Sequence, residues 1–364
     1  MRFNPDQPLG PDFRDAIRGA LTSFVETQRD LLAEAGPRLD GVWRHCAQLV
    51  AGGKRVRPAF CYWSFVAASG SPNEEDDERA LTVAASLDLL HLAALVHDDV
   101  IDASDTRRGV PSAHRLFAAE HAAAGRLGDP DQAGLAGAIL LGDLLMSWSV
   151  AMAGRSGWKP SRMRRAQAYL DAVRSEVVAG QFLDLIHQAD PEPGDDFVAA
   201  STLVMDFKTS RYTVARPAQI GAALGGADDA TIDGLGRFGA HVGRAYQMRD
   251  DLLGVFGDAE VTGKPVGGDL REGKRTVLIG YALRDAEPAQ AQRLAAMLGD
   301  PTLTEADITE AKAIIQGSGA VEATERMIVA EASAGERHLS RLGLTGEGTA
   351  ALAALVHAAV ERTG

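Results

Sequence analysis

The sequence of 364 residues is poor in cysteine and aromatic residues, and it carries no excess of positive charge. Its two cysteines, Cys46 and Cys61, have neither the number nor the spacing of a disulfide framework or a zinc site, so we expect a protein of the reducing cytoplasm. The net charge of −13 argues against nonspecific binding to nucleic acid or an anionic membrane. It does not exclude a small anionic ligand, because a few Lys and Arg side chains can form a positive pocket.

Membrane-directing segments are lacking as well. The N-terminal residues contain no apolar signal core. The most membrane-like run, residues 134–154, carries a charged residue, Asp143, near its middle. A charge at the centre of a membrane span is costly. We therefore expect this run to form a buried helix and predict no integral membrane span.

Apolar residues recur at intervals of three and four along nearly the whole chain, a spacing typical of amphipathic helices. No run is rich enough in β-branched and aromatic residues to predict a strand. Short segments rich in Gly, Pro and Asp separate the helices, and the acidic segment 74–78 is interpreted as a solvated loop. None is long enough for an interdomain linker. The sequence predicts an all-α, single-domain bundle of about a dozen helices over residues 1–364, with a motif-bearing core at about 50–280 and a short, flexible N-terminal segment.

Four aspartates end one apolar helical run: Asp98, Asp99, Asp102 and Asp105. Asp98 and Asp102 are one helical turn apart and share a face, whereas Asp99 points about 100° away. Like charges at this spacing repel, so the cluster weakens the helix unless a cation neutralises it. A solvated helix end remains the alternative for this segment taken alone.

A second helical run ends in Asp250 and Asp251, and Asp258 follows. Mg²⁺ prefers carboxylate oxygens and keeps several waters when it is shared with substrate phosphates. Zinc fits less well because His and Cys are not interleaved at ligand spacing, and calcium because an EF-hand pattern is absent. Two acidic clusters on helices facing a common cavity would hold a diphosphate through Mg²⁺.

Basic residues accompany both acidic clusters. Lys54 and Arg57 lie three residues apart after a Gly-Gly break and could grip an anion, although a solvated helix start is the commoner meaning of this pattern. His91 lies seven residues before Asp98, on about the same helix face, so a core role and a ligand role are evenly matched. The other basic candidates are Arg107, Arg108, Lys208, Lys264 and Lys274, the last two in a Gly-rich segment without P-loop spacing.

Six motifs occur in one order between residues 52 and 276: GGKRVRP, DDVIDASDTRRG, GQFLD, FKTS, YQMRDDLLG and TGKPVGGDLREGK. Together they resemble the trans-prenyl diphosphate synthase family. The resemblance implies an all-α fold around a central substrate cavity, a homodimer, and three Mg²⁺ ions bound with the allylic diphosphate. It also implies that the chain condenses isopentenyl diphosphate with an allylic diphosphate.

The resemblance implies a role for each matching residue. Asp98 and Asp102 match the ligands of two Mg²⁺ ions, with Asp99 in support, and Asp250 matches the ligand of a third. Isopentenyl diphosphate is bound at the positions of Lys54, Arg57, His91 and Arg108. The allylic diphosphate is touched at the positions of Arg107, Lys208, Lys264 and Lys274. The remaining substrate-site positions are Gln181 and Asp184 in the cavity wall, Thr209 and Gln247 near the developing cation, and Tyr246. The catalytic set is Asp98, Asp99, Asp102, Arg107, Lys208, Thr209, Gln247, Asp250 and Lys264.

Two positions depart from the family pattern. Gly254 stands where many relatives carry a third aspartate, which weakens any metal role for the end of the second acidic motif. Asp88 stands where relatives often have Glu, a change expected to be minor.

The product tail is expected to run along the helix that carries Asp98. Ala94 and Ala93 lie about one turn, or 5 Å, before Asp98. The family resemblance implies that a bulky aromatic in this region closes the cavity at shorter products. Two alanines favour C20, geranylgeranyl diphosphate, over C15, with C25 or longer as the alternative. Leu90, Leu89 or Met146 would then form the next floor.

Two further alternatives belong to other classes of protein. A noncatalytic subunit of a hetero-oligomeric synthase would have degenerate aspartate motifs, and those of this chain are largely intact. A terpene cyclase would not need the GGKRVRP motif to hold isopentenyl diphosphate.

Overall fold

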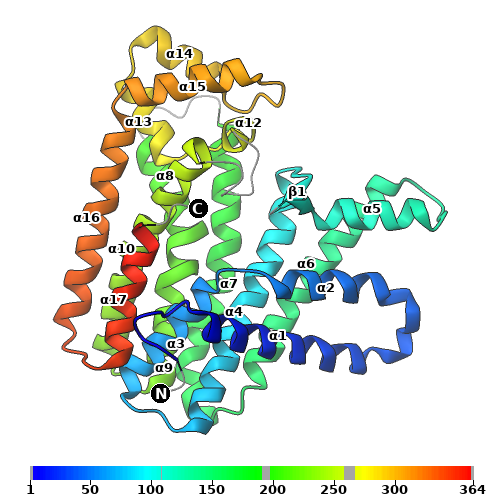
Figure 1. Cartoon of the computed structure of the whole chain (residues 1–364), viewed down its shortest axis with the longest axis vertical. Helices are drawn as coiled ribbons and strands as arrows, with labels where there is room; N and C mark the ends of the chain where they lie inside the picture. Colours follow the sequence, from blue (N-terminus) through cyan, green and yellow to red (C-terminus); the bar gives the residue numbers. More distant parts are fainter. Residues whose placement is uncertain (1–2, 108, 191–196, 258–266, 362–364) are drawn as a thin grey trace. The chain divides into compact units, whose positions relative to one another are not determined.

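The computed structural model describes residues 3–107, 109–190, 197–257 and 267–361, and they are almost entirely helical (Figure 1). The prediction of an all-α fold is confirmed. The chain divides into two compact units. One contains residues 1–167, 220–227 and 345–352, and the other contains residues 168–219, 228–344 and 353–364. That the whole chain acts as a single domain stays a prediction.

The first unit is built around one long helix, α4 (Glu74–Ile101). Its buried residues occur on nearly every side, which is the pattern of a central rather than a surface helix. The elements around it are α1 (Pro11–Leu31), η1 (Ala33–Leu39), α2 (Asp40–Ala51), α3 (Val56–Ser69), β1 (Thr106–Arg107), β2 (Val110–Pro111), α5 (Ala113–Ala123) and α6 (Pro130–Gly154), and β1 pairs with β2 in an antiparallel hairpin.

Helix α4 begins in the acidic segment that had been interpreted as a loop. Asn73 is the N-cap, and its side chain accepts a hydrogen bond of 2.9 Å from the backbone N–H of Asp76. Acidic residues fill the first turn, where they interact favourably with the positive end of the helix dipole. Asp77 is buried and accepts a hydrogen bond of 2.5 Å from the Tyr62 hydroxyl. The prediction of a solvated loop at 74–78 is therefore wrong.

The segment before α1 is packed onto the aromatic core of the first unit. The ring of Phe3 lies edge-on to those of Phe13 and Tyr62, each at 5.3 Å between centroids. Trp63 Nε1 donates a hydrogen bond of 3.1 Å to the carbonyl of Pro8. These contacts join the N-terminal residues to α3.

Helices α4 and α6 are both long and apolar enough to cross a membrane by length and composition. The apolar stretch of α4 is 72% buried, whereas that of α6 is only 39% buried. One face of α6 packs on α4 and α5, and the other leaves Ile139, Leu140 and Val150 exposed. The buried helix predicted for residues 134–154 is thus buried on one face only.

Helix α10 (Asp229–Phe256) is the centre of the second unit and packs against α16 and η2. The apolar side chains of Met248 and Leu252 lie in a core that includes Leu278 and Ile279. The other elements are α8 (Phe197–Met205), the π-helix η2 (Asp206–Ala215), α12 (Gly268–Arg271), α13 (Val277–Asp285), α14 (Pro288–Met297), α15 (Glu305–Gly317) and α16 (Ala320–Arg341), while α7 (Pro160–Ala189), α9 (Arg216–Gly225) and α17 (Glu347–Val360) have residues in both units.

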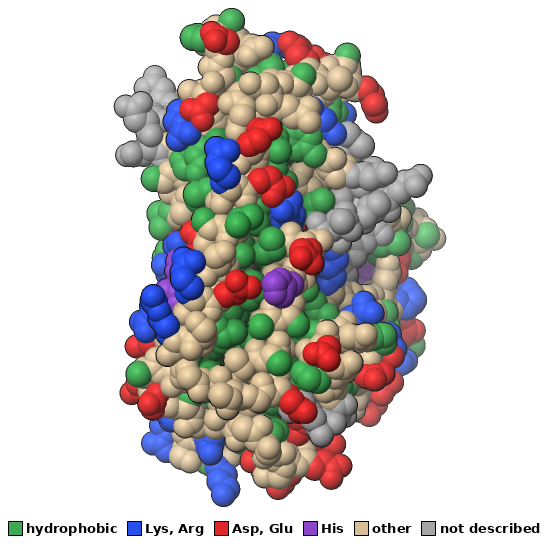
Figure 2. Space-filling view, turned by 60° about the vertical axis from the view of Figure 1, so that its left-hand side comes forward, with side chains coloured by type: hydrophobic (Ala, Val, Ile, Leu, Met, Phe, Trp, Pro, Cys, Tyr) green, Lys and Arg blue, Asp and Glu red, His purple; other side chains and the backbone are tan. Residues whose placement is uncertain are grey.

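The charges on the surface are mixed. On the face shown in Figure 2, Lys and Arg side chains are interspersed with Asp and Glu rather than gathered in one region. On this face, an anion-binding site would have to be built locally, from a few side chains held in a defined geometry.

Candidate active site

The first acidic cluster lies at the C-terminal end of α4. Asp98 and Asp102 are partly exposed, whereas Asp99 is 3% exposed. Asp102 is the C-cap residue, and its backbone N–H donates to the carbonyl of Asp98 at 2.8 Å. This end of the helix carries the negative end of the dipole, so carboxylates are unfavourable here without cations nearby. Asp98 and Asp102 are thus one helical turn apart, as their spacing in the sequence predicts.

Arg107 provides a positive charge for this cluster. The chain turns back at Ala103, whose φ of +51° lies in the left-handed region that usually favours glycine. The hairpin then places Arg107 Nε and Nη2 at 2.6 and 2.5 Å from Asp99 Oδ1, and Nη2 at 3.9 Å from Asp98 Oδ2. Burial raises the pKa of Asp99, and the hydrogen bond from Arg107 opposes that rise. Asp99 therefore orients Arg107 beside Asp98. Arg108 lies outside the described residues.

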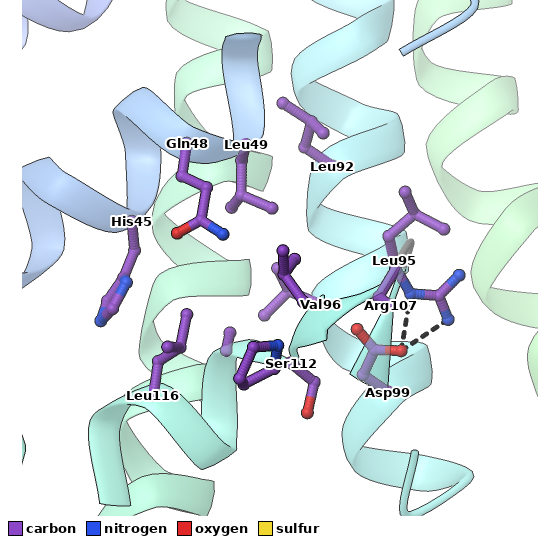
Figure 3. Close-up of a pocket in the computed structure, with 13 residues that line it drawn as sticks. His45, Gln48, Leu49, Leu92, Leu95, Val96, Asp99, Arg107, Ser112 and Leu116 are labelled. Carbon is purple, nitrogen blue, oxygen red and sulfur yellow. Dashed lines mark hydrogen bonds and ion pairs between the residues drawn. The ribbon is translucent and has the colours of Figure 1, made fainter. Parts of the chain in front are cut away.

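A pocket of about 90 Å³ lies on a neighbouring face of α4. Figure 3 shows the ion pair of Asp99 and Arg107 at one end, and the apolar side chains of Leu92 and Val96 along the helix. The rest of the lining comes from α2, the hairpin and α5. This apolar lining keeps the Asp99 carboxylate away from water and so strengthens its pairing with Arg107.

A buried ion pair fixes the GGKRVRP segment. Arg55 is 3% exposed, has a left-handed φ of +58°, and donates hydrogen bonds to the Asp88 carboxylate and the Val50 carbonyl. Asp88 is likewise 3% exposed. Breaking a buried pair of this kind costs about 3–5 kcal/mol. Arg55 therefore holds the chain that presents the exposed Lys54 and the partly buried Arg57.

Sequence reasoning gave no role to Arg55 and treated Asp88 as a minor departure. The two residues are 33 positions apart, so no local spacing indicates that they pair. The available signal was the coincidence of an Arg in a basic motif with an Asp inside an apolar helical run.

The other predicted residues of α4 lie as helix geometry requires. His91 is partly exposed, seven positions before Asp98. Ala93 and Leu90 are buried, and Ala94 is partly exposed. Ala94 is thus the more exposed of the two alanine candidates for chain length.

In the second unit, Lys208 lies on the π-helix η2 and is held by a carboxylate of α7. Its Nζ lies 2.6 Å from Asp184 Oδ2, and Asp184 is 7% exposed. Gly180 allows the close approach of these elements: a Cβ there would lie 2.3 Å from the Lys208 backbone nitrogen. Gln181 and Thr209 are partly buried in the same segments.

The second acidic cluster lies near the end of α10. Asp250 is partly exposed, whereas Asp251 is 7% exposed and accepts a hydrogen bond of 2.7 Å from Gln247 Nε2. Burial, with Asp269 and Asp250 nearby, raises the pKa of Asp251 to about 8, while Gln247 and Lys274 act in the opposite direction. Sequence reasoning noted Asp251 but gave it no role.

Lys274 belongs to the same cluster. Its Nζ lies 2.7 Å from Glu272 Oε2 and 3.6 Å from Asp269 Oδ1. Tyr246, like Gln247, is partly exposed on α10. Lys264 and Asp258 lie outside the described residues.

Both acidic clusters fit Mg²⁺ that is shared with a diphosphate. Within the described ranges, no group of three or more His, Cys, Asp or Glu side chains forms a ready metal cage. Mg²⁺ shared with substrate phosphates needs only one or two protein carboxylates, because phosphate and water oxygens complete its coordination. Asp98 with Asp102, and Asp250, are oxygen donors of this kind and are partly open to solvent. Arg107 lies near Asp98 in the first cluster, and Lys274 acts on Asp251 in the second.

Comparison with known proteins gives the family. Residues 41–315 match the polyprenyl synthetase family. The chain belongs to this family. The family and the enzyme class expected from the six motifs are thereby confirmed: the protein is a trans-prenyltransferase of the isoprenyl diphosphate synthase type.

Relatives of this polyprenyl synthetase match most of its length. It is 37% identical to the crystal structure of geranylgeranyl pyrophosphate synthase from Corynebacterium glutamicum complexed with isoprenyl diphosphate and magnesium, with a TM-score of 0.91 over 96% of this chain and 98% of that one. It is 33% identical to geranylfarnesyl diphosphate synthase of Aeropyrum pernix, over 81% of this chain and 85% of the relative. It is 32% identical to nonaprenyl diphosphate synthase of Mycobacterium tuberculosis, over 97% and 95%. The relatives' names refer to products of different lengths.

The environment of Asp251 predicts that stability depends on pH. Its folded-state pKa of about 8 lies above the ~3.9 of an exposed Asp, so between these values the folded protein holds a proton that the unfolded chain has released. Stability is therefore lost as pH rises through this window. We expect the Tm in Mg²⁺-free buffer to fall as pH rises from about 5 to about 9, and Asp251→Asn to reduce the slope. Calorimetry at constant ionic strength measures this.

The matched control is Asp233→Asn, which alters an exposed aspartate on the same helix. The control is expected to keep the wild-type slope. Equal slopes in the wild type and Asp251→Asn would contradict the assignment.

Proposed function

We propose that the protein catalyses Mg²⁺-dependent, trans head-to-tail condensation of isopentenyl diphosphate with an allylic diphosphate, and that its main product is geranylgeranyl diphosphate. The observation that carries the proposal is the placement of Asp98 and Asp102 one turn apart at the C-terminal end of α4, with Arg107 held beside Asp98 by Asp99. Carboxylates for a cation and an oriented guanidinium for phosphate are the two requirements for binding a metal diphosphate.

In this proposal, Asp98, Asp102 and Asp250 hold Mg²⁺, with three ions expected when the allylic diphosphate is bound. Bound Mg²⁺ supplies Lewis acid stabilisation of the departing diphosphate. The cationic contacts to the allylic diphosphate are Arg107, Lys208, Lys264 and Lys274, and those to isopentenyl diphosphate are Lys54, Arg57, Arg108 and, when protonated, His91.

Two of these basic side chains are pre-oriented by acidic partners. Arg107 is bound by Asp99, and Lys208 by Asp184. Cations fixed in this way need little reorganisation when negative charge develops on the leaving group, which is the main source of electrostatic catalysis.

The reaction then runs by ionisation and addition. The allylic C–O bond breaks, the isopentenyl double bond attacks the resulting cation to form the new C–C bond, and a proton passes from the adduct to the departed diphosphate. Water must be excluded because it would quench the cation. We propose that the wall of this space includes Gln181, Asp184, Thr209, Tyr246 and Gln247.

A C20 product is supported by the small side chains of Ala93 and Ala94 above Leu90 on α4. A product of C25 or longer is the second candidate, favoured by the same small residues and by the names of the relatives from Aeropyrum and Mycobacterium. A C15 product, a noncatalytic subunit and a terpene cyclase have less support, because the cavity-closing aromatic is absent and both acidic and basic motifs are present.

We also propose a cytoplasmic homodimer. The thiols of Cys46 and Cys61 are free and buried, as suits a reducing compartment. The exposed face of α6 carries Ile139, Leu140 and Val150, which are 46%, 67% and 48% exposed and would be covered by a second copy.

The dimer is tested by light scattering of the purified protein. We expect twice the mass of the chain, and Leu140→Glu to shift the mass towards that of the monomer, because a buried charge in an apolar interface is unfavourable. Arg155→Glu, a charge change just beyond the end of α6, is the control. A monomeric wild type would contradict the proposal.

The activity is tested with Mg²⁺, isopentenyl diphosphate and, separately, dimethylallyl, geranyl and farnesyl diphosphate, with products sized after dephosphorylation. We expect elongation that is abolished by EDTA and reduced about 10²–10³-fold by Asp98→Asn, the scale typical of lost transition-state electrostatics. Asp233→Asn, a charge loss on an exposed face, is the control. An absence of elongation from every starter would contradict catalysis and would favour the noncatalytic subunit.

The length of the product is tested with Ala94→Phe. Ala94 is partly exposed, whereas the fully buried Ala93 would be overpacked by a larger side chain. We expect the ratio of C20 to C15 product to fall at least about tenfold, as for other changes of pocket volume. Ala94→Ser, which hardly changes volume, should leave the ratio unchanged. A folded Ala94→Phe with the wild-type products would place the floor elsewhere.

A further inference from the structure

The bare backbone of Gly254 on α10 is covered by the carboxylate of Asp269 from α12. A Cβ at position 254 would lie 1.8 Å from Asp269 Oδ2 and 2.8 Å from its Cγ. Asp269 is 7% exposed, so its carboxylate has little freedom to move aside. The carboxylate therefore occupies the space that a side chain at position 254 would fill.

That space adjoins the second acidic cluster. Residue 254 follows Asp250 by four positions, so the two share one face of α10. Asp269 Oδ2 faces Gly254, while Oδ1 lies 3.6 Å from Lys274 Nζ. Asp269 thus stands between Lys274 and the face of α10 that carries Asp250.

We infer that Asp269 supplies, from α12, the third carboxylate of the second acidic cluster, and that position 254 is glycine to admit it. This inference rests on the proposed function. Asp269 is a positioning residue: it orients Lys274 towards the diphosphate and adds negative charge for the cation beside Asp250. In the family motif, α10 carries the third carboxylate at the position of Gly254. In this chain, α12 supplies that carboxylate from Asp269.

The experiment moves the carboxylate and follows Mg²⁺ binding directly. The probe is Mg²⁺ with inorganic pyrophosphate, and the readout is the Mg²⁺ concentration that gives half of the maximal rise in Tm. Gly254→Ala should displace the Asp269 carboxylate, and Asp269→Asn should remove its charge. Each is expected to raise the half-saturating Mg²⁺ concentration about tenfold, as lost support of a metal site usually does.

Two combined variants make the test specific. Because both single changes disrupt one contact, Gly254→Ala with Asp269→Asn should be no worse than either alone. Gly254→Asp with Asp269→Ala returns a carboxylate to the same place from α10 and should restore the half-saturating Mg²⁺ concentration to within about threefold of the wild type. The matched control is Glu272→Gln, which alters another carboxylate on Lys274, at 2.7 Å, and should raise the concentration less than Asp269→Asn.

The Tm without Mg²⁺ reports folding separately from binding. Additive effects of the two single changes would overturn the inference, even if the combined aspartate variant fails to fold. A folded combined variant that binds Mg²⁺ no better than Asp269→Ala would overturn it too. If the wild type elongates and Asp269→Asn binds Mg²⁺ normally, this inference fails and the proposed function stands. If the wild type neither elongates nor responds to Mg²⁺ with pyrophosphate, both fail.

Discussion

Helix α4 ends where its dipole is negative, and at that end it carries Asp98, Asp99 and Asp102. Charge and dipole both oppose this arrangement, so the first unit depends on how the negative charge is compensated. Asp99 is paired internally with Arg107, which also lies near Asp98, whereas Asp98 and Asp102 are partly exposed. The same ion pair holds the hairpin against the helix.

The pairing of a basic side chain with an acidic one recurs at two other residues of the proposed site. Lys208 is paired with Asp184 in the second unit, and Lys274 with Glu272. A cation without such a partner would be flexible and strongly hydrated, and would have to be ordered in every reaction cycle. In a chain with a net charge of −13, positive charge for an anionic ligand can therefore come from a few local side chains that are already oriented.

Local geometry explains what could be predicted from the sequence. The helical period gave the all-α fold, and the four-residue spacing gave the shared face of Asp98 and Asp102. The pairing of Arg55 with Asp88 could not be found in this way, because it depends on packing between residues 33 positions apart. The raised pKa of Asp251 depends on burial and on Asp269, which comes from another helix. The loop expected at 74–78 was wrong for a different reason: a run of acids is typical of a solvated loop, but it is also what a helix N-terminus favours.

The glycines within helices show most clearly why some contacts of the site could not be predicted from the sequence. In a sequence, glycine reads as a breaker of helices, and a glycine within a helix is intrinsically destabilising. Gly142 of α6 meets the His97 ring of α4, Gly180 of α7 meets the backbone of Lys208, and Gly254 of α10 meets Asp269. Each brings a functional helix closer to its neighbour than any other residue allows. The function of each glycine is therefore to leave space for a particular neighbour. The sequence does not show which residue that neighbour is, because it comes from another helix.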